Sequence, residues 1–145
     1  MSPATVSPVG EVDEPVRIVS ITVKPSRLVV DVSIPDELNR RTTPERAAHV
    51  LERFPTLREH ACVNGRGRTF GSVIESTSIA HLLEHLAIEL QTRASAHEAA
   101  TFVGTTEWLD ERVGLARIQL SFKDDLEALR ALRDAVRFLN DMLSM

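Results

Sequence analysis

The feature that most constrains the fold is the segment Ser78–Gln91, whose sequence is SIAHLLEHLAIELQ. Its apolar residues recur at the i, i+3, i+4, i+7 spacing of an amphipathic helix, and we predict a helix over Thr77–Thr92. An apolar stripe of this kind has to be buried against another layer of secondary structure. The residues of the stripe are Ile79, Leu82, Leu83, Leu86, Ala87 and Leu90.

Strands are predicted on both sides of this helix in the chain. The β-rich runs Val16–Val23 and Arg27–Ile34 are joined by a short turn at Lys24-Pro25-Ser26, a pattern that is typical of a hairpin. Thr101–Val103 and Leu115–Phe122 are two further predicted strands. The sheet that they form would supply the second layer.

The other helices are marked by their ends. Thr43 precedes Pro44 as an N-cap residue precedes the first helical position, and that helix should stop before Pro55. We predict a short helix over Thr56–Ala61, a loop over Cys62–Gly71 and a long closing helix over Asp124–Leu143. The leucine stripe of the closing helix is either core or a seam between copies of the chain. The predicted fold class is α+β, with a small antiparallel or mixed sheet packed against helices in a single domain over residues 16–145.

Composition excludes several classes of protein. A formal net charge of -4 and a pI of about 5.7 disfavour a generic nucleic-acid-binding protein, which would carry a basic excess. No apolar run approaches the roughly 18 residues that cross a membrane. The segment Met1–Pro15 is rich in proline and acids and is predicted to be a flexible leader without a secretory signal. The single cysteine, Cys62, cannot form an internal disulfide, which favours a cytoplasmic location.

The polar residues of the Ser78–Gln91 helix form a possible metal site. His81 and His85 are one turn apart, so both imidazoles can reach one metal ion, and Glu84 projects beside them. This is the H-x-x-E-H arrangement of inverzincins, in which the histidines bind zinc and the glutamate is the general base. The alternative is a helix face in contact with solvent only. Ile88 lies on the same face and indicates that the face is at least partly covered.

Three segments resemble the N-terminal domain of cyanophycin synthetase, the enzyme that polymerises Asp and Arg. Thr77–Gln91 resembles the signature of that domain, and Phe54–Cys62 (FPTLREHAC) resembles its L-P-x-L-x-E-H-x-C stretch. Phe102–Glu107 (FVGTTE) is similar to its F-G-x-T-x-E-T region. The resemblance implies either a metallopeptidase-like site that cuts the polymer or an architectural domain. The ATP-grasp and Mur-ligase-like domains that perform synthesis are not expected in this chain, so polymerisation is not expected either.

A catalytic zinc usually takes three protein ligands, and the third is open here. Cys62 is the first candidate because it lies in the matched E-H-x-C stretch and thiolate is a good zinc ligand, although it could equally be a buried apolar residue. The other candidates are His60, Glu89 and Glu107. His60 could instead stand behind the ligands, and Glu89 could form a structural salt bridge.

The predicted function is that of a zinc-dependent peptidase or amidase acting on a charged or isopeptide-linked chain, with Glu84 as general base. Arg66 and Arg68 would bind carboxylates of the substrate, and Glu107 would bind a guanidinium group, although both sets could also be solvated surface charge. The alternative function is a non-catalytic metal- or peptide-binding module that assists an ATP-grasp or Mur-ligase-like synthetase. The expected partners are therefore a peptide or polyamide and such a synthetase, and copies of the chain could also associate.

Overall fold

The computed structural model describes residues 14–95 and 101–145. All but the last two residues of the predicted leader, Met1–Pro15, lie outside the described residues. No helix within the described residues is long and apolar enough to cross a membrane.

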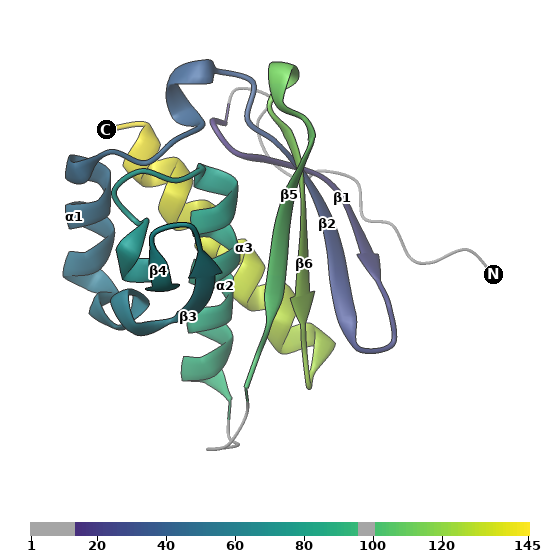
Figure 1. Cartoon of the computed structure of the whole chain (residues 1–145). Helices are drawn as coiled ribbons and strands as arrows, with labels where there is room; N and C mark the ends of the chain where they lie inside the picture. The colour runs from purple at the N-terminus through teal and green to yellow at the C-terminus, as the bar shows by residue number, and fades with distance from the viewer. Residues whose placement is uncertain (1–13, 96–100) are drawn as a thin grey trace.

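The described residues form a sheet of four antiparallel strands in the order β1-β2-β6-β5 (Figure 1). Valine, isoleucine and leucine alternate with polar residues in β2 and β6, so the two central strands place one apolar face towards the helices. The edge strands β1 and β5 are less apolar on that face. The strands are β1 (Arg17–Val23), β2 (Arg27–Ser33), β5 (Gly104–Asp110) and β6 (Leu115–Ser121).

Two helices cover the apolar face of the sheet. The helix α2 (Ile79–Ala94) packs on β5 and β6 and runs beside α3 (Asp125–Leu143). A third layer lies on the other side of α2, formed by α1 (Pro44–Arg53) and the hairpin of β3 (Ala61–Asn64) and β4 (Gly67–Thr69) (Figure 1). Because α2 lies between these layers, it is buried on nearly all sides, including the face that carries the histidines.

Most of the elements predicted from sequence are confirmed. The fold is a single small α+β domain, as expected. Thr43 caps α1, because its hydroxyl accepts a hydrogen bond from the Arg46 backbone N–H, and Pro44 is the first helical residue. The closing helix begins after Asp124, whose carboxylate accepts from two backbone N–H groups of the first turn.

Three local predictions are wrong. The strand expected at Thr101–Val103 begins at Gly104 instead. The residues from Gly104 onwards are largely polar, as is usual for an edge strand with one face in solvent, so the sequence pattern did not identify them as a strand. The predicted loop Cys62–Gly71 contains the hairpin β3–β4, in which Asn64 pairs with Gly67 across a tight turn. The short helix expected over Thr56–Ala61 is a 3-10 turn over Pro55–Glu59, which ends as the chain enters β3.

Candidate metal site and cleft

The first turn of α2 places the histidines. The Ser78 hydroxyl accepts a hydrogen bond from the His81 backbone N–H and caps the helix, so its register is fixed at this end. His85 and Glu84 follow one turn later, and their exposed fractions are only 3% and 5%. The solvent-exposed helix face that was the alternative interpretation is therefore not what this fold contains.

Cys62 meets the two histidines from the hairpin. One potential ligand atom each from Cys62, His81 and His85 lies within 4.8 Å of the others, and Cys62 Sγ is 3.5 Å from His81 Nε2. In a tetrahedral zinc site with bonds of about 2.0–2.3 Å, neighbouring ligand atoms are roughly 3.3–3.8 Å apart. A thiolate with two imidazoles is also a donor set that suits zinc. The cluster could therefore hold a metal ion, and three ligands would leave a fourth position open.

The ring of His81 is oriented for such a role by its neighbours. The Thr77 hydroxyl lies 2.9 Å from His81 Nδ1, on the side of the ring away from Cys62. When Nδ1–H donates to this hydroxyl, the lone pair is on Nε2, which is the nitrogen that faces the thiol. Phe70 packs edge-on against this ring at 5.0 Å and holds it in place.

A chain of hydrogen bonds does the same for His85. His60 Nδ1 is 3.1 Å from His85 Nδ1, and His60 Nε2 is 2.9 Å from Glu89 Oε1. A carboxylate can only accept, so His60 Nε2–H donates to Glu89 and His60 Nδ1 accepts from His85 Nδ1–H. The lone pair of His85 is then on Nε2, the nitrogen left for a metal. The second carboxylate oxygen of Glu89 accepts from Arg93, and Thr56 donates to the first.

Burial favours the neutral form of both histidines of α2. It lowers the pKa of His85 to about 3, with smaller contributions from His81 and His60, and it also lowers the pKa of His81. For Glu89, burial alone would raise the pKa, but the hydrogen bonds from Thr56, His60 and Arg93 together lower it. A neutral imidazole is the form that binds a metal, and an ionised Glu89 is the form that fixes the tautomers.

Glu84 is held beside the cluster. Its Oε1 accepts a 2.6 Å hydrogen bond from the Thr106 hydroxyl on β5, and its Oε2 is 3.7 Å from His85 Nε2. Burial raises the pKa of Glu84, while the hydrogen bond from Thr106 lowers it by a smaller amount. A carboxylate with a raised pKa is a stronger base than an ordinary one, which suits proton transfer.

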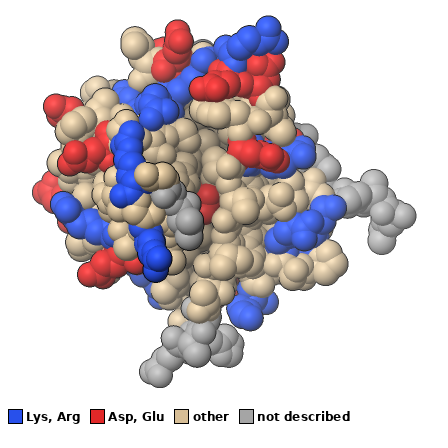
Figure 2. Space-filling model, viewed as in Figure 1, with Lys and Arg blue, Asp and Glu red and all other residues tan. Residues whose placement is uncertain are grey.

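The cluster opens into a cleft of about 490 Å³ between the hairpin and the edge of the sheet. Figure 2 shows the surface hollowed between these two parts of the molecule. One wall is Ala61 and Cys62 of β3, and the other is five consecutive residues of β5, from Gly104 to Trp108. The site therefore combines a possible metal centre, a buried carboxylate and room for a ligand.

The structure brings some of the predicted site residues together and separates others. His81, Glu84, His85 and Cys62 meet in the cleft, whereas His60 and Glu89 stand behind His85. Glu107 lies at the rim on β5, in register with Arg117 of β6.

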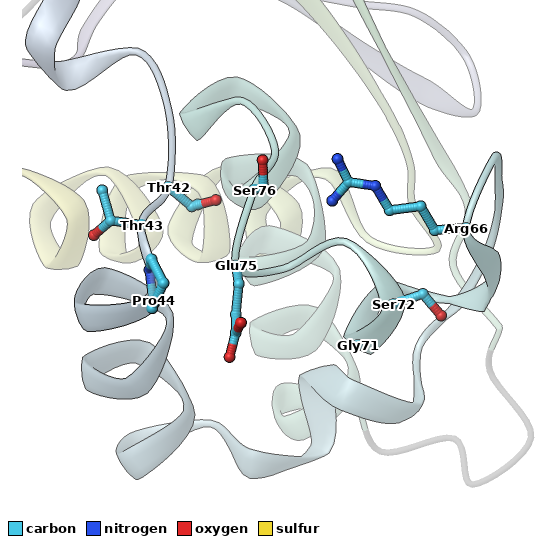
Figure 3. A pocket seen from close by; sticks show the side chains of 8 residues that line it. All are labelled: Thr42, Thr43, Pro44, Arg66, Gly71, Ser72, Glu75 and Ser76. Carbon is cyan, nitrogen blue, oxygen red and sulfur yellow. The ribbon is translucent and has the colours of Figure 1, made fainter.

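Neither arginine of the hairpin lines the cleft. Arg66 lines a different pocket of about 450 Å³, beside the start of α1 and Glu75 (Figure 3). Arg68 is exposed on β4.

Four residues that sequence analysis missed support the site. Thr77 orients His81, Thr106 binds Glu84, Thr56 binds Glu89, and Phe70 stacks on His85 at 4.1 Å. Thr77 could have been found, because it is one turn before His81. The other three come from distant segments and carry no local signal.

Two comparisons bear on the identity of the chain. None of the curated proteins compared with it matches. A family model described as the cyanophycin synthase-like N-terminal domain matches residues 27–144, a range that includes every residue of the cluster and of the cleft described above. The chain belongs to the family of cyanophycin synthase-like N-terminal domains.

Proposed function

We propose that this chain is a metal- and peptide-binding module that assists a peptide synthetase of the ATP-grasp or Mur-ligase-like kind. The observation that carries the proposal is the cluster of Cys62, His81 and His85 on the floor of an open cleft, in a chain of this family. A cleft with a few convergent polar groups and shifted pKa values is the usual form of a binding site.

Zinc is the metal that the donor set favours. Thiolate and imidazole ligands select zinc over magnesium or calcium, which prefer oxygen ligands. Protein purified without a histidine tag should contain about one zinc ion per chain or take one up on titration. A stoichiometry near zero that added zinc cannot raise would exclude the metal site. Cys62→Ser serves as the matched variant, since it keeps the size of the side chain and removes the soft ligand.

The ligand is proposed to be a peptide with charged side chains. Glu107 is at the rim of the cleft, and Asp110 and Glu111 follow it at the end of β5. Guanidinium groups pair well with carboxylates, so arginine side chains on the ligand fit this rim. Calorimetry with cyanophycin, with its β-Asp-Arg unit and with a neutral peptide should rank the neutral peptide last. Tighter binding of the neutral peptide would contradict a charged ligand.

A second candidate function is hydrolysis of the bound peptide, and the specific observation in its favour is Glu84. Its carboxylate is buried beside His85 with a raised pKa and faces the cleft. A zinc ion, when bound, would supply a Lewis acid that polarises the scissile carbonyl. Glu84 Oε2 takes a proton from the attacking water while the oxygen of that water bonds to the carbonyl carbon. The same atom then gives the proton to the leaving nitrogen as the C–N bond breaks.

Glu84→Gln tests hydrolysis separately from binding. The amide keeps the hydrogen bond from Thr106 but cannot accept a proton, so turnover should fall by about a thousandfold or more while zinc remains bound. Glu75→Gln is the control, because it removes an exposed carboxylate that lines the other pocket and belongs neither to the cluster nor to the cleft. Equal turnover in Glu84→Gln and the wild type would exclude Glu84 as the general base and end the hydrolase hypothesis. If no zinc-loaded protein shows turnover, the binding module is the function that stands.

A further inference from the structure

We propose that the edge of β5 binds the main chain of the ligand as an added β-strand. This inference deepens the proposed function and rests on it, because it names the part of a peptide that the cleft recognises. The ligand class is an extended polypeptide segment whose backbone amides, rather than its side chains, set its position beside Glu84.

The first observation is that β5 ends the sheet. It is paired on one side with β6 through residues 104–110, and within the described residues no strand pairs with its other side. An edge strand presents a row of N–H and C=O groups that can pair with another chain. The open edge of β5 therefore has the chemistry to bind a peptide backbone.

The second observation is which residues face that edge. The Ser121 backbone N–H donates to the Val103 carbonyl, so the main chain of Val103 points towards β6. In an antiparallel pair the residues alternate between pointing at the partner and pointing away from it. Gly104 and Thr106 therefore direct their N–H and C=O groups outwards.

The third observation is that this edge is a wall of the cleft. Every residue from Gly104 to Trp108 lines it, opposite Cys62. With a rise of about 3.3 Å per residue, a strand segment of this length accommodates roughly four or five residues of an extended peptide. A peptide paired with β5 would thus run past the metal cluster.

The close approach of β5 to Glu84 fixes where the peptide would meet the reactive groups. A Cβ built at Gly104 would lie 2.9 Å from Glu84 Cγ and 3.1 Å from its Oε2, so a larger residue has no room there. The Thr106 side chain is turned to the helix side and donates to Glu84 Oε1. The main chain at these two positions is thus left at the edge, and the Glu84 carboxylate lies against it.

The charge around the edge favours an extended peptide over a second copy of this chain. The residues of β5 that face solvent are Thr105, Glu107 and Leu109, and Asp110 ends the strand. If two β5 edges paired, acidic residues from both copies would come together at the interface, and like charges across strands are unfavourable. A peptide that carries arginine would place cations next to Glu107 instead.

The test uses the zinc-loaded full chain and hydroxamates, which bind a metal through their own oxygen atoms. The probes are acetohydroxamate and an N-acetylated tetrapeptide hydroxamate of alternating arginine and alanine. We expect the peptide to bind at least about tenfold more tightly, since it adds two or more backbone hydrogen bonds and each contributes about fivefold in affinity. N-methylation of the peptide amides one at a time should weaken binding at every second position and have little effect at the positions between.

Amide hydrogen exchange followed by NMR gives a second measurement. Binding of the peptide hydroxamate should slow exchange at Gly104 and Thr106 by about tenfold or more, in proportion to site occupancy. Thr105 and Glu107, which are directed at β6, should exchange slowly with or without the peptide. If the peptide adds equal protection at all four residues, or adds protection at none of them, the edge-strand proposal is overturned.

The outcomes separate this inference from the proposed function. If acetohydroxamate binds but the peptide binds no more tightly, or N-methylation shows no alternation, the edge-strand proposal falls and the metal module stands. If neither probe binds zinc-loaded protein, the metal module falls and takes the edge-strand proposal with it. A stable dimer at micromolar concentration that the peptide cannot dissociate would assign the edge to a second copy and overturn the proposal.

Discussion

Two pockets of nearly equal volume, about 490 Å³ and about 450 Å³, differ in how their polar groups are used. In the second pocket (Figure 3) the hydroxyls already serve the fold. Thr43 caps α1, and Thr42 Oγ1 accepts from the Thr77 backbone N–H. In the cleft, His81 and Glu84 have pKa values shifted by burial, and a ligand atom of His81 is close to Cys62. Volume alone therefore does not identify a functional site, whereas buried titratable groups beside open space do.

The largest expected effect is a loss of zinc affinity from a substitution in the cleft, which leaves the second pocket unchanged. His81→Ala removes one of three ligands, and structural zinc sites with four ligands bind by about 10–16 kcal/mol in total. One ligand is thus worth roughly 2.5–4 kcal/mol, so zinc affinity should fall by about a hundredfold to a thousandfold. Competition with a chromophoric chelator would measure it.

The matched control for this loss is Glu75→Gln in the second pocket. Glu75 is exposed and lines the pocket that contains Arg66, so its neutralisation should leave zinc affinity within about twofold. The side chains suggest that only the cleft binds a metal. A similar loss of zinc affinity in His81→Ala and Glu75→Gln would contradict this difference between the two pockets.

A smaller effect is expected from His60, which contacts His85 and would not contact the metal. His60→Ala leaves His85 Nδ1 without the partner that fixes its tautomer. Partners of this kind are worth roughly 10–100-fold in metal affinity. His49 of α1, which packs against Phe138 of α3, provides the control His49→Ala. An unchanged zinc affinity in His60→Ala would show that the hydrogen-bond chain does not orient His85.

Sequence patterns predicted those parts of the fold whose signals are local. The cap at Thr43, the hairpin β1–β2 and the apolar stripe of α2 each follow from residues a few positions apart. The strand β5 was placed too early because its helix-side positions are Gly104, Thr106 and Trp108, which lack the apolar alternation of a central strand. An edge strand beside a cleft need not be apolar.

The site, like the fold, has features with a local sequence signal and features without one. The spacing of His81, Glu84 and His85 is local and predicted a shared site, and Cys62 was proposed as the third ligand through the family resemblance. The burial of Glu84 depends on β5, and the contact of His60 with His85 depends on where the chain enters β3. Packing between segments far apart in the sequence determines both of these features, so no residue spacing along the sequence predicts them.

The pH dependence of metal-free protein sharpens the comparison further. Burial lowers the pKa of His85 to about 3, whereas an unfolded histidine has a pKa of about 6.5. The folded state therefore binds fewer protons than the unfolded state, and stability is lost as the pH falls from about 6.5 towards 3. Between pH 7 and pH 5 the loss from His85 is about 2 kcal/mol.

Urea denaturation of wild type and His85→Leu at both pH values isolates this contribution, since the other groups titrate in both proteins. His81 adds to the loss, and Glu84 opposes it, because its raised pKa favours the folded state as it takes up a proton. A wild type as sensitive to acid as His85→Leu would show that His85 is solvated in the folded protein.

The smallest expected effect comes from the second pocket, where Thr43→Ala should lower stability without touching the cleft. The Thr43 hydroxyl accepts a 3.1 Å hydrogen bond from the Arg46 backbone N–H, and loss of an N-cap of this type costs about 1 kcal/mol. Zinc affinity should be unchanged, because α1 supplies none of the three cluster residues. Thr43→Ser, which keeps the hydroxyl, should restore most of the stability. A loss of zinc in Thr43→Ala at a pH and temperature where the protein is folded would couple the two pockets and end the contrast between them.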